Sequence, residues 1–135
     1  MNYHFSTMVN YPFDEAVAKA TEALREEGFG ILTEIDVKET LKQKLDIDFR
    51  RYKILGACNP ALAYRALKTE DKIGVMLPCN VVVQEISNGT VEVSAVDPLA
   101  SMMAIDNAEL QIVAFEVQDK LKKVIAGLQA AKVSV

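Results

Sequence analysis

The chain has 135 residues, of which 50% are hydrophobic and 25% are charged. This composition is that of one ordinary globular domain; it excludes a disordered chain and leaves no room for two well-packed domains. The 19 acidic and 15 basic residues give a net charge of −4, which argues against nucleic acid as a partner because phosphate binding needs clustered cations.

The hydrophobic segments carry no targeting or membrane signal. The first ten residues lack the cationic start and apolar core of a signal peptide. The most apolar stretch, residues 73–83, is interrupted by Gly74, Pro78 and Asn80 and is too short to span a bilayer. We therefore expect a cytoplasmic protein with no membrane partner, in which the two cysteines are mainly reduced.

The first elements alternate between strand and helix. Residues 3–9 alternate in the manner of a strand, Pro12 opens an amphipathic helix, and Gly28 ends that helix in a left-handed conformation. A second strand is predicted over residues 29–35, and Asp36 begins a short helix as its cap.

The middle of the chain predicts a third strand over residues 51–57. The Asn59-Pro60 pair then begins a helix over residues 61–68. A further strand is predicted over residues 73–77.

A hairpin follows, because Asn88-Gly89 favours the type I′ turn between residues 81–86 and 90–96. A two-residue turn would pair Ile86 with Val91 and Glu85 with Glu92, a mildly destabilising like-charge pair.

That register leaves the hairpin apolar on both faces at the end away from the turn. One face would carry Val82 and Ala95, and the other would carry Val81, Val83 and Val96. We expect helices to cover one face, and a further helix, a second subunit or a ligand to cover the other.

The last element is a long helix over residues 107–128. Asp106 and Glu109 are its expected caps. Its apolar stripe comprises Leu110, Val113, Val117, Leu121, Val124 and Leu128.

Two Cys-Asn pairs at junctions between elements are the candidate chemistry. Pro60 suits the first position of a helix and Asn59 its N-cap, so Cys58 stands just before free backbone amides. A thiol there tends to have a lowered pKa, and the same amides could hold an anion. Cys79-Asn80 is the second pair.

Other interpretations of these residues stay open. Free cysteine commonly serves as a small buried hydrophobe, and Asn59-Pro60 is explained by capping alone. Two cysteines 21 positions apart form no CxxC motif, and no zinc ligand set is present. His4 could meet either cysteine in space, and Met102 could be a soft ligand or adaptable packing.

Three segments of the chain resemble the family known as domain of unknown function 302. They are FDEAVAKATEALREEGFGILTEIDVKETLKQKL, YKILGACNPALAYRAL and LPCNVVVQE, followed by Asp97-Pro98. The likeness runs from about Tyr3 through Val124, and its most specific parts are GFGILTEIDV, GACNP and LPCNVVV.

The resemblance implies a fold and a set of residues. The implied fold is a single α+β domain, residues 1–135, with a curved, mainly antiparallel sheet packed by helices, similar to the TATA-binding-protein-like architecture and dimeric. It also places Cys58, Asn59, Pro60, Cys79 and Asn80 in the signature segments, with no activity attached.

We therefore carry three hypotheses. The first is a homodimeric module whose site near Cys58 and Asn59 binds a small anionic or soft ligand or a partner. The second is thiol redox chemistry, or binding of a soft metal or haem, by Cys58 and Cys79. The third keeps both cysteines in the core with no chemical role. The sequence assigns no cofactor, no metal and no reaction.

Overall fold

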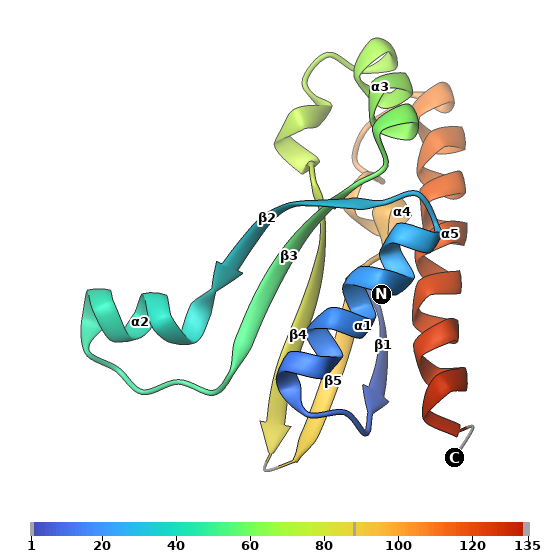
Figure 1. Ribbon diagram of the computed structural model, residues 1–135. Helices are drawn as coiled ribbons and strands as arrows, with labels where there is room; N and C mark the ends of the chain where they lie inside the picture. Colours follow the sequence, from blue (N-terminus) through green and yellow to red (C-terminus); the bar gives the residue numbers. More distant parts are fainter. Residues whose placement is uncertain (1, 88, 134–135) are drawn as a thin grey trace.

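The computed structural model describes residues 2–87 and 89–133, with side chains placed as far as residue 129. Figure 1 shows its strands and helices in space. The elements are β1 (His4–Val9), α1 (Phe13–Glu26), β2 (Gly30–Asp36), α2 (Val37–Leu45), β3 (Tyr52–Cys58), α3 (Pro60–Thr69), the 3₁₀ helix η1 (Ile73–Met76), β4 (Cys79–Ser87), β5 (Thr90–Val96), α4 (Pro98–Ser101) and α5 (Ala108–Val133).

The strands form one antiparallel sheet in the order β1-β5-β4-β3-β2. Helices α1 and α5 pack on one face of this sheet (Figure 1). The core lies between them, and it includes Leu24 of α1, Val83 of β4 and Leu121 of α5, all fully buried. The expected α+β fold, an antiparallel sheet packed by helices, is confirmed.

The end of α1 follows from local chemistry, as predicted. Gly28 has a φ of +87°, the left-handed region that glycine enters without a steric penalty. The amides of Gly28 and Phe29 donate to the carbonyl oxygens of Arg25 and Leu24 at 3.0 and 2.9 Å. These bonds satisfy the last turn of the helix and turn the chain into β2.

The hairpin register predicted from the sequence is wrong. Ser87 pairs with Thr90, but Glu85 then pairs with Val91 and Gln84 with Glu92, because the ladder is interrupted between Glu85 and Ser87. A bulge inserts one extra residue into one strand and shifts all later pairs by one position. Asn88 of the predicted turn lies outside the described residues.

The shifted register also changes which residues share a face of the hairpin. Val81 and Val83 share the helix-covered face with Val93, all three of them buried. The other face carries Gln84 directly opposite Glu92, so the like-charge pair does not form. This face is polar near the turn, but Val82 and Val96 leave it apolar at the other end, as expected.

Residues 73–77 form no strand, contrary to the prediction. They contain η1, whose Ile73 is fully buried while Val75 is 83% exposed. Ile73 instead belongs to the core cluster that contains Leu62 of α3 and Leu110 of α5, away from the sheet.

The expected caps of the last helix are also wrong. Asn107 is the cap: its Oδ1 accepts from the amide of Leu110 at 3.1 Å. Its Nδ2 donates to the carbonyl oxygen of Thr69 at 3.0 Å, which ties the start of α5 to the end of α3. The short helix α4, capped by Asp97, was not predicted.

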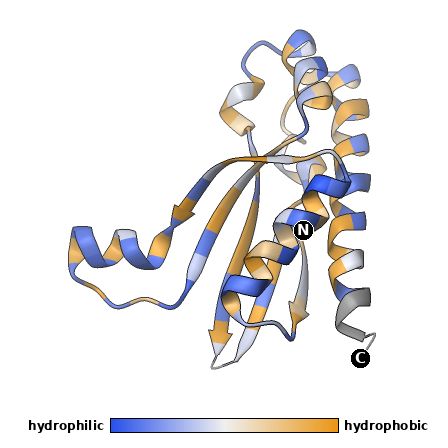
Figure 2. Ribbon diagram, viewed as in Figure 1, coloured by the Kyte–Doolittle hydropathy of each residue, from blue (hydrophilic) through white to orange (hydrophobic). Residues whose placement is uncertain are grey.

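Strands β2 and β3 extend beyond the helices and carry α2 at their tip as an arm (Figure 1). Asp36 caps α2 as predicted, accepting from the amide of Glu39 at 3.0 Å. Helix α2 buries no side chain and is largely hydrophilic (Figure 2). Within the described part of the chain, every helix is too short or too polar to cross a bilayer.

Candidate functional site

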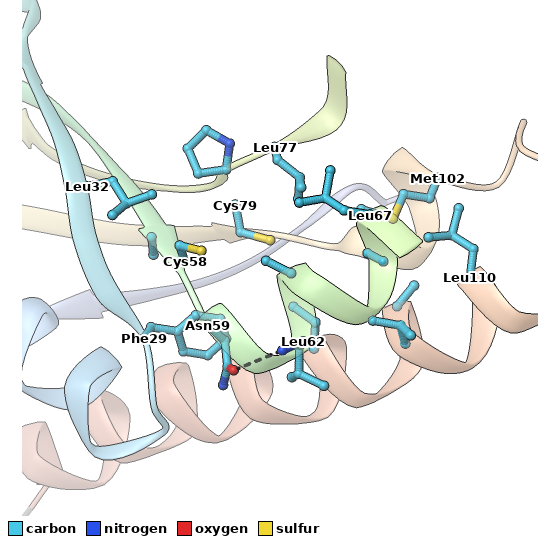
Figure 3. Close-up of a pocket in the computed structure, with 17 residues that line it drawn as sticks. Phe29, Leu32, Cys58, Asn59, Leu62, Leu67, Leu77, Cys79, Met102 and Leu110 are labelled. Carbon is cyan, nitrogen blue, oxygen red and sulfur yellow. Dashed lines mark hydrogen bonds between the residues drawn. The ribbon is translucent and has the colours of Figure 1, made fainter. Parts of the chain in front are cut away.

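A cavity of about 270 Å³ lies between the sheet and the helices α3 and α5 (Figure 3). Strands β3 and β4, the segment before β4, and α3 and α5 form its walls. The lining residues are Phe29, Leu32, Ala57, Cys58, Asn59, Leu62, Ala63, Ala66, Leu67, Leu77, Pro78, Cys79, Met102, Leu110, Val113, Ala114 and Val117.

The walls are almost wholly apolar. Among the described lining residues only Asn59 carries an amide, and none carries a charge. Small side chains leave the space: Ala63 and Ala66 of α3 and Ala114 of α5 line the cavity where larger residues would fill it. The sequence did not identify these three alanines as cavity-lining residues. The pattern of one helix does not show which residues of a second helix it will face.

Asn59 is held by two bonds of its own amide. Its Oδ1 accepts from the amide of Leu62 at 3.3 Å, which is the predicted N-cap, and its Nδ2 donates to the carbonyl oxygen of Glu27 at 3.3 Å. Both ends of the side chain are thus engaged in structure. Asn59 therefore forms a fixed part of the cavity wall, and its side-chain amide is not free to bind a ligand.

The start of α3 offers little to an anion. Pro60 has no N–H, the amide of Leu62 is taken by Asn59 Oδ1, and the amide of Ala63 donates to the Asn59 carbonyl at 2.8 Å. Only the amide of Ala61 stays free in the first turn, whereas anion sites use several converging amides.

Both cysteines lie on the cavity wall, near one another (Figure 3). Ala57 of β3 pairs with Cys79 of β4, and Cys58 directly follows Ala57 in the chain. Cys58 is half-buried and Cys79 is only 8% exposed; neither is in a disulfide.

Burial, and to a smaller extent the like charge of the neighbouring Cys58, raise the pKa of the Cys79 thiol from 9.0 to about 11. Cys79 is therefore a protonated thiol at neutral pH. A nucleophile needs the thiolate, so of the two cysteines Cys58 is the one placed for reactivity.

Gly56 makes the close approach at the cavity's edge possible. A Cβ at this position would collide with Oγ1 of Thr33 on β2 and would lie 2.8 Å from Cγ of Pro78. Only glycine lets β2 and the Leu77-Pro78 segment meet over β3. The GACNP segment thus combines a packing glycine, a cavity thiol and a helix cap.

The other predicted site residues are dispersed. Asn80 is exposed and lines a separate hollow on the uncovered face of the sheet, with His4. Pro60 is exposed at the start of α3 and does not line the cavity. Met102 does line it and is buried.

His4 lies on the far face, so it forms no pair with either cysteine. The described residues contain no group of three His, Cys, Asp or Glu able to hold a metal ion.

The fold and cavity define a small α+β protein in which helices and an antiparallel sheet border an open apolar cavity with two thiols in its wall. The model of the family "Domain of unknown function DUF302" matches residues 5–128, and the chain belongs to this family.

A crystal structure of an uncharacterized conserved DUF302 protein from Bacillus stearothermophilus is similar throughout. It shares 29% identity with a TM-score of 0.87, over 95% of this chain and 99% of the other. No curated protein matches the chain.

Proposed function

We propose that the protein is a binding module for a small, apolar or soft ligand, held in the cavity between the sheet and the helices α3 and α5. The observation that carries this proposal is the cavity itself: about 270 Å³ of space with apolar walls and two thiols. Protein interiors are normally packed with few voids larger than a water molecule. This cavity is open to solvent, since its lining residues Leu32 and Leu67 are 66% and 46% exposed, and a bound ligand would remove its apolar walls from water.

The size of the cavity limits the ligand. An apolar cavity of about 150 Å³ is enough to bind benzene, so this one suits a molecule of one ring with short substituents. Haem does not fit this space as it stands. The cavity offers an anion no cation and only one free amide, so of the expected anionic or soft ligand we keep the soft one, and the apolar walls add an apolar one.

Sulfur gives the cavity its chemical character. Cys58, Cys79 and Met102 place three sulfur atoms in the wall. Sulfur is polarisable and contacts aromatic rings favourably. We therefore expect aromatic and sulfur-containing molecules to bind more tightly than aliphatic ones of the same size.

The test compares indole and thiophenol with cyclohexanol in thermal unfolding. Binding to the folded state stabilises it with the logarithm of the ratio of ligand concentration to Kd, so indole is expected to raise Tm and cyclohexanol to raise it less. Ala63→Leu fills the cavity and should abolish the shift. Ala61→Leu is the matched control, since Ala61 is exposed on the same helix and does not line the cavity. Equal shifts in the two variants would refute the proposal.

The pair of thiols in one wall supports a second candidate, the binding of a soft metal ion. Thiolates are the ligands that such ions prefer, and binding displaces their protons. Titration with Cu(I) under anaerobic conditions tests it. A 1:1 complex lost in both Cys58→Ala and Cys79→Ala supports the idea, and a complex that survives both substitutions refutes it.

The expected homodimer also stays a proposal, and the arm is what supports it. Leu32, Ile35, Leu45 and Ile47 are exposed there, on β2 and at the end of α2. A second copy would cover these side chains. Sedimentation equilibrium of the protein and of Leu45→Lys tests this: a monomer in both would refute it.

A further inference from the structure

The uncovered face of the sheet carries a second hollow, of about 370 Å³, on the side opposite the cavity. Its lining residues come from β1, β3, β4 and β5, with Tyr3 just before β1: Tyr3, His4, Tyr52, Asn80, Val82, Gln84, Glu92, Ser94, Ala95 and Val96. Apolar side chains from β4 and β5 form part of it, and two tyrosines also line it, Tyr3 before the edge strand β1 and Tyr52 at the start of β3.

A chain of side-chain hydrogen bonds crosses this hollow. Nδ1 of His4 is bonded to Oγ of Ser6 at 2.7 Å, and Oγ of Ser6 to Oγ of Ser94 at 2.8 Å. Ser94 Oγ then donates to Oε1 of Glu92 over a long 3.5 Å. The chain follows directly from the register, because Ser6 is paired with Ser94 and every second residue of a strand shares a face.

The chain continues on the other side of Glu92. Nε2 of Gln84 donates to the same Oε1 at 3.5 Å, and Nε of Arg50 donates to Oε1 of Gln84 at 3.0 Å. Donors thus reach Oε1 of Glu92 from both sides. Oε2 of Glu92 has no protein partner in the described part of the chain, and Glu92 forms no ion pair with a described residue.

Either serine can be the donor in the bond between Ser6 and Ser94, and we infer the direction in which the chain ends on the Glu92 carboxylate. A carboxylate only accepts, and each serine hydroxyl has one proton to give. When Ser94 donates to Glu92, Ser6 donates to Ser94, and His4 must then donate from Nδ1. That leaves Nε2 of His4 as a free acceptor.

We propose that this hollow binds a small protonated amine with a second hydrogen-bond donor at its far end. The ammonium group meets Oε2 of Glu92, and the second donor meets Nε2 of His4. The Glu92 carboxylate is the one charge of the hollow with no ion pair to a described cation, and an ammonium group would neutralise it. Tyr3 and Tyr52 add aromatic rings, which attract cations and pack against flat ligands.

The test uses three related probes in isothermal titration calorimetry. Tyramine has both groups, tyrosol replaces the ammonium with a hydroxyl, and phenethylamine lacks the phenolic donor. Because hydrogen bonds to charged groups are about twice as strong as those between neutral groups, tyramine should bind at least about tenfold more tightly than tyrosol. Its advantage over phenethylamine should be smaller.

Two variants test which residue binds the ammonium and which binds the phenolic donor of tyramine. Glu92→Gln should remove the advantage of tyramine over tyrosol, and His4→Phe should remove its advantage over phenethylamine. Glu85→Gln is the matched control: it removes the same charge from β4, on the other face of the hairpin. Equal binding of tyramine and tyrosol, or equal losses in Glu92→Gln and Glu85→Gln, would overturn the proposal.

The proton orientation has its own readout. His4 is the only histidine, so the imidazole nitrogen signals in a two-bond ¹H–¹⁵N spectrum belong to one residue. The neutral ring is expected to carry its proton on Nδ1, and Ser94→Ala should shift the population towards the Nε2–H form. A ring already protonated on Nε2 in the unmodified protein would refute the assigned acceptor.

Discussion

Asn59 at the start of α3 is joined to Glu27 at the end of α1: its Nδ2 donates to the Glu27 carbonyl oxygen at 3.3 Å. The same side chain caps α3 by accepting from Leu62. The side-chain amide of Asn59 therefore bonds to the end of α1 and caps the start of α3. It also lies in the cavity wall between these two helices. Gly28 makes this contact possible, because a Cβ there would lie 2.9 Å from Nδ2 of Asn59.

Replacing Asn59 should separate these two roles. Asn59→Ala loses both bonds, and because a lost cap costs about 1 kcal/mol and a lost hydrogen bond about as much again, we expect a loss of roughly 2 kcal/mol. Asn59→Asp keeps the cap and loses only the donor to Glu27. Urea unfolding measures both, and equal losses in the two variants would contradict the dual role.

The features that the sequence predicted correctly depend on neighbours along the chain. The left-handed Gly28, the Asp36 cap and the Asn59-Pro60 helix start are each decided within four residues. Their partners are in the same segment, so the residue types alone indicate the structure.

The features that were missed depend on distant partners. The bulge after Glu85 is a property of the pairing between β4 and β5, so the sequence of β4 alone does not indicate it. Residues 73–77 are rich in strand-forming types, but Ile73 is buried in a cluster with residues of α3 and α5, which are distant in the sequence or in another element. Cys79 and Asn80 were predicted as one site, yet they begin β4, where consecutive side chains point to opposite faces. A predicted strand that began at Cys79 instead of residue 81 would have placed the two side chains on opposite faces.

Gly56 should tolerate no side chain. Gly56→Ala places a methyl group against Thr33 and Pro78, and because overpacking typically costs about 1–3 kcal/mol, we expect a loss in that range. Gly74→Ala is the control, since a Cβ there meets nothing within 4 Å. Denaturant unfolding compares the two.

Combining Gly56→Ala with Thr33→Ala removes one of the two colliding groups. It should restore part of the loss relative to the sum of the single substitutions. Strict additivity of the two losses would show that Thr33 is not what excludes the methyl group.

The thiols should differ sharply in reactivity. Iodoacetamide is expected to modify Cys58 in the folded protein, because its side chain is half-buried on the cavity wall, while Cys79 stays protected. Mass spectrometry after limited alkylation, followed by peptide mapping, identifies the modified residue. Modification of Cys79 first would contradict both its burial and its raised pKa.

Stability should fall at alkaline pH through Cys79. Its pKa is about 11 in the folded protein against an ordinary 9.0, so the folded state holds the proton more tightly than the unfolded state. The stabilisation is complete below pH 9 and is lost as the pH rises towards 11. A difference between those two pKa values corresponds to roughly 2–3 kcal/mol. Tyrosines and lysines titrate in the same range, so Cys79→Ala supplies the comparison: its free energy of unfolding should decline less between these two pH values than that of Cys58→Ala. Parallel declines in the two variants would show that burial of the Cys79 thiol does not govern the effect.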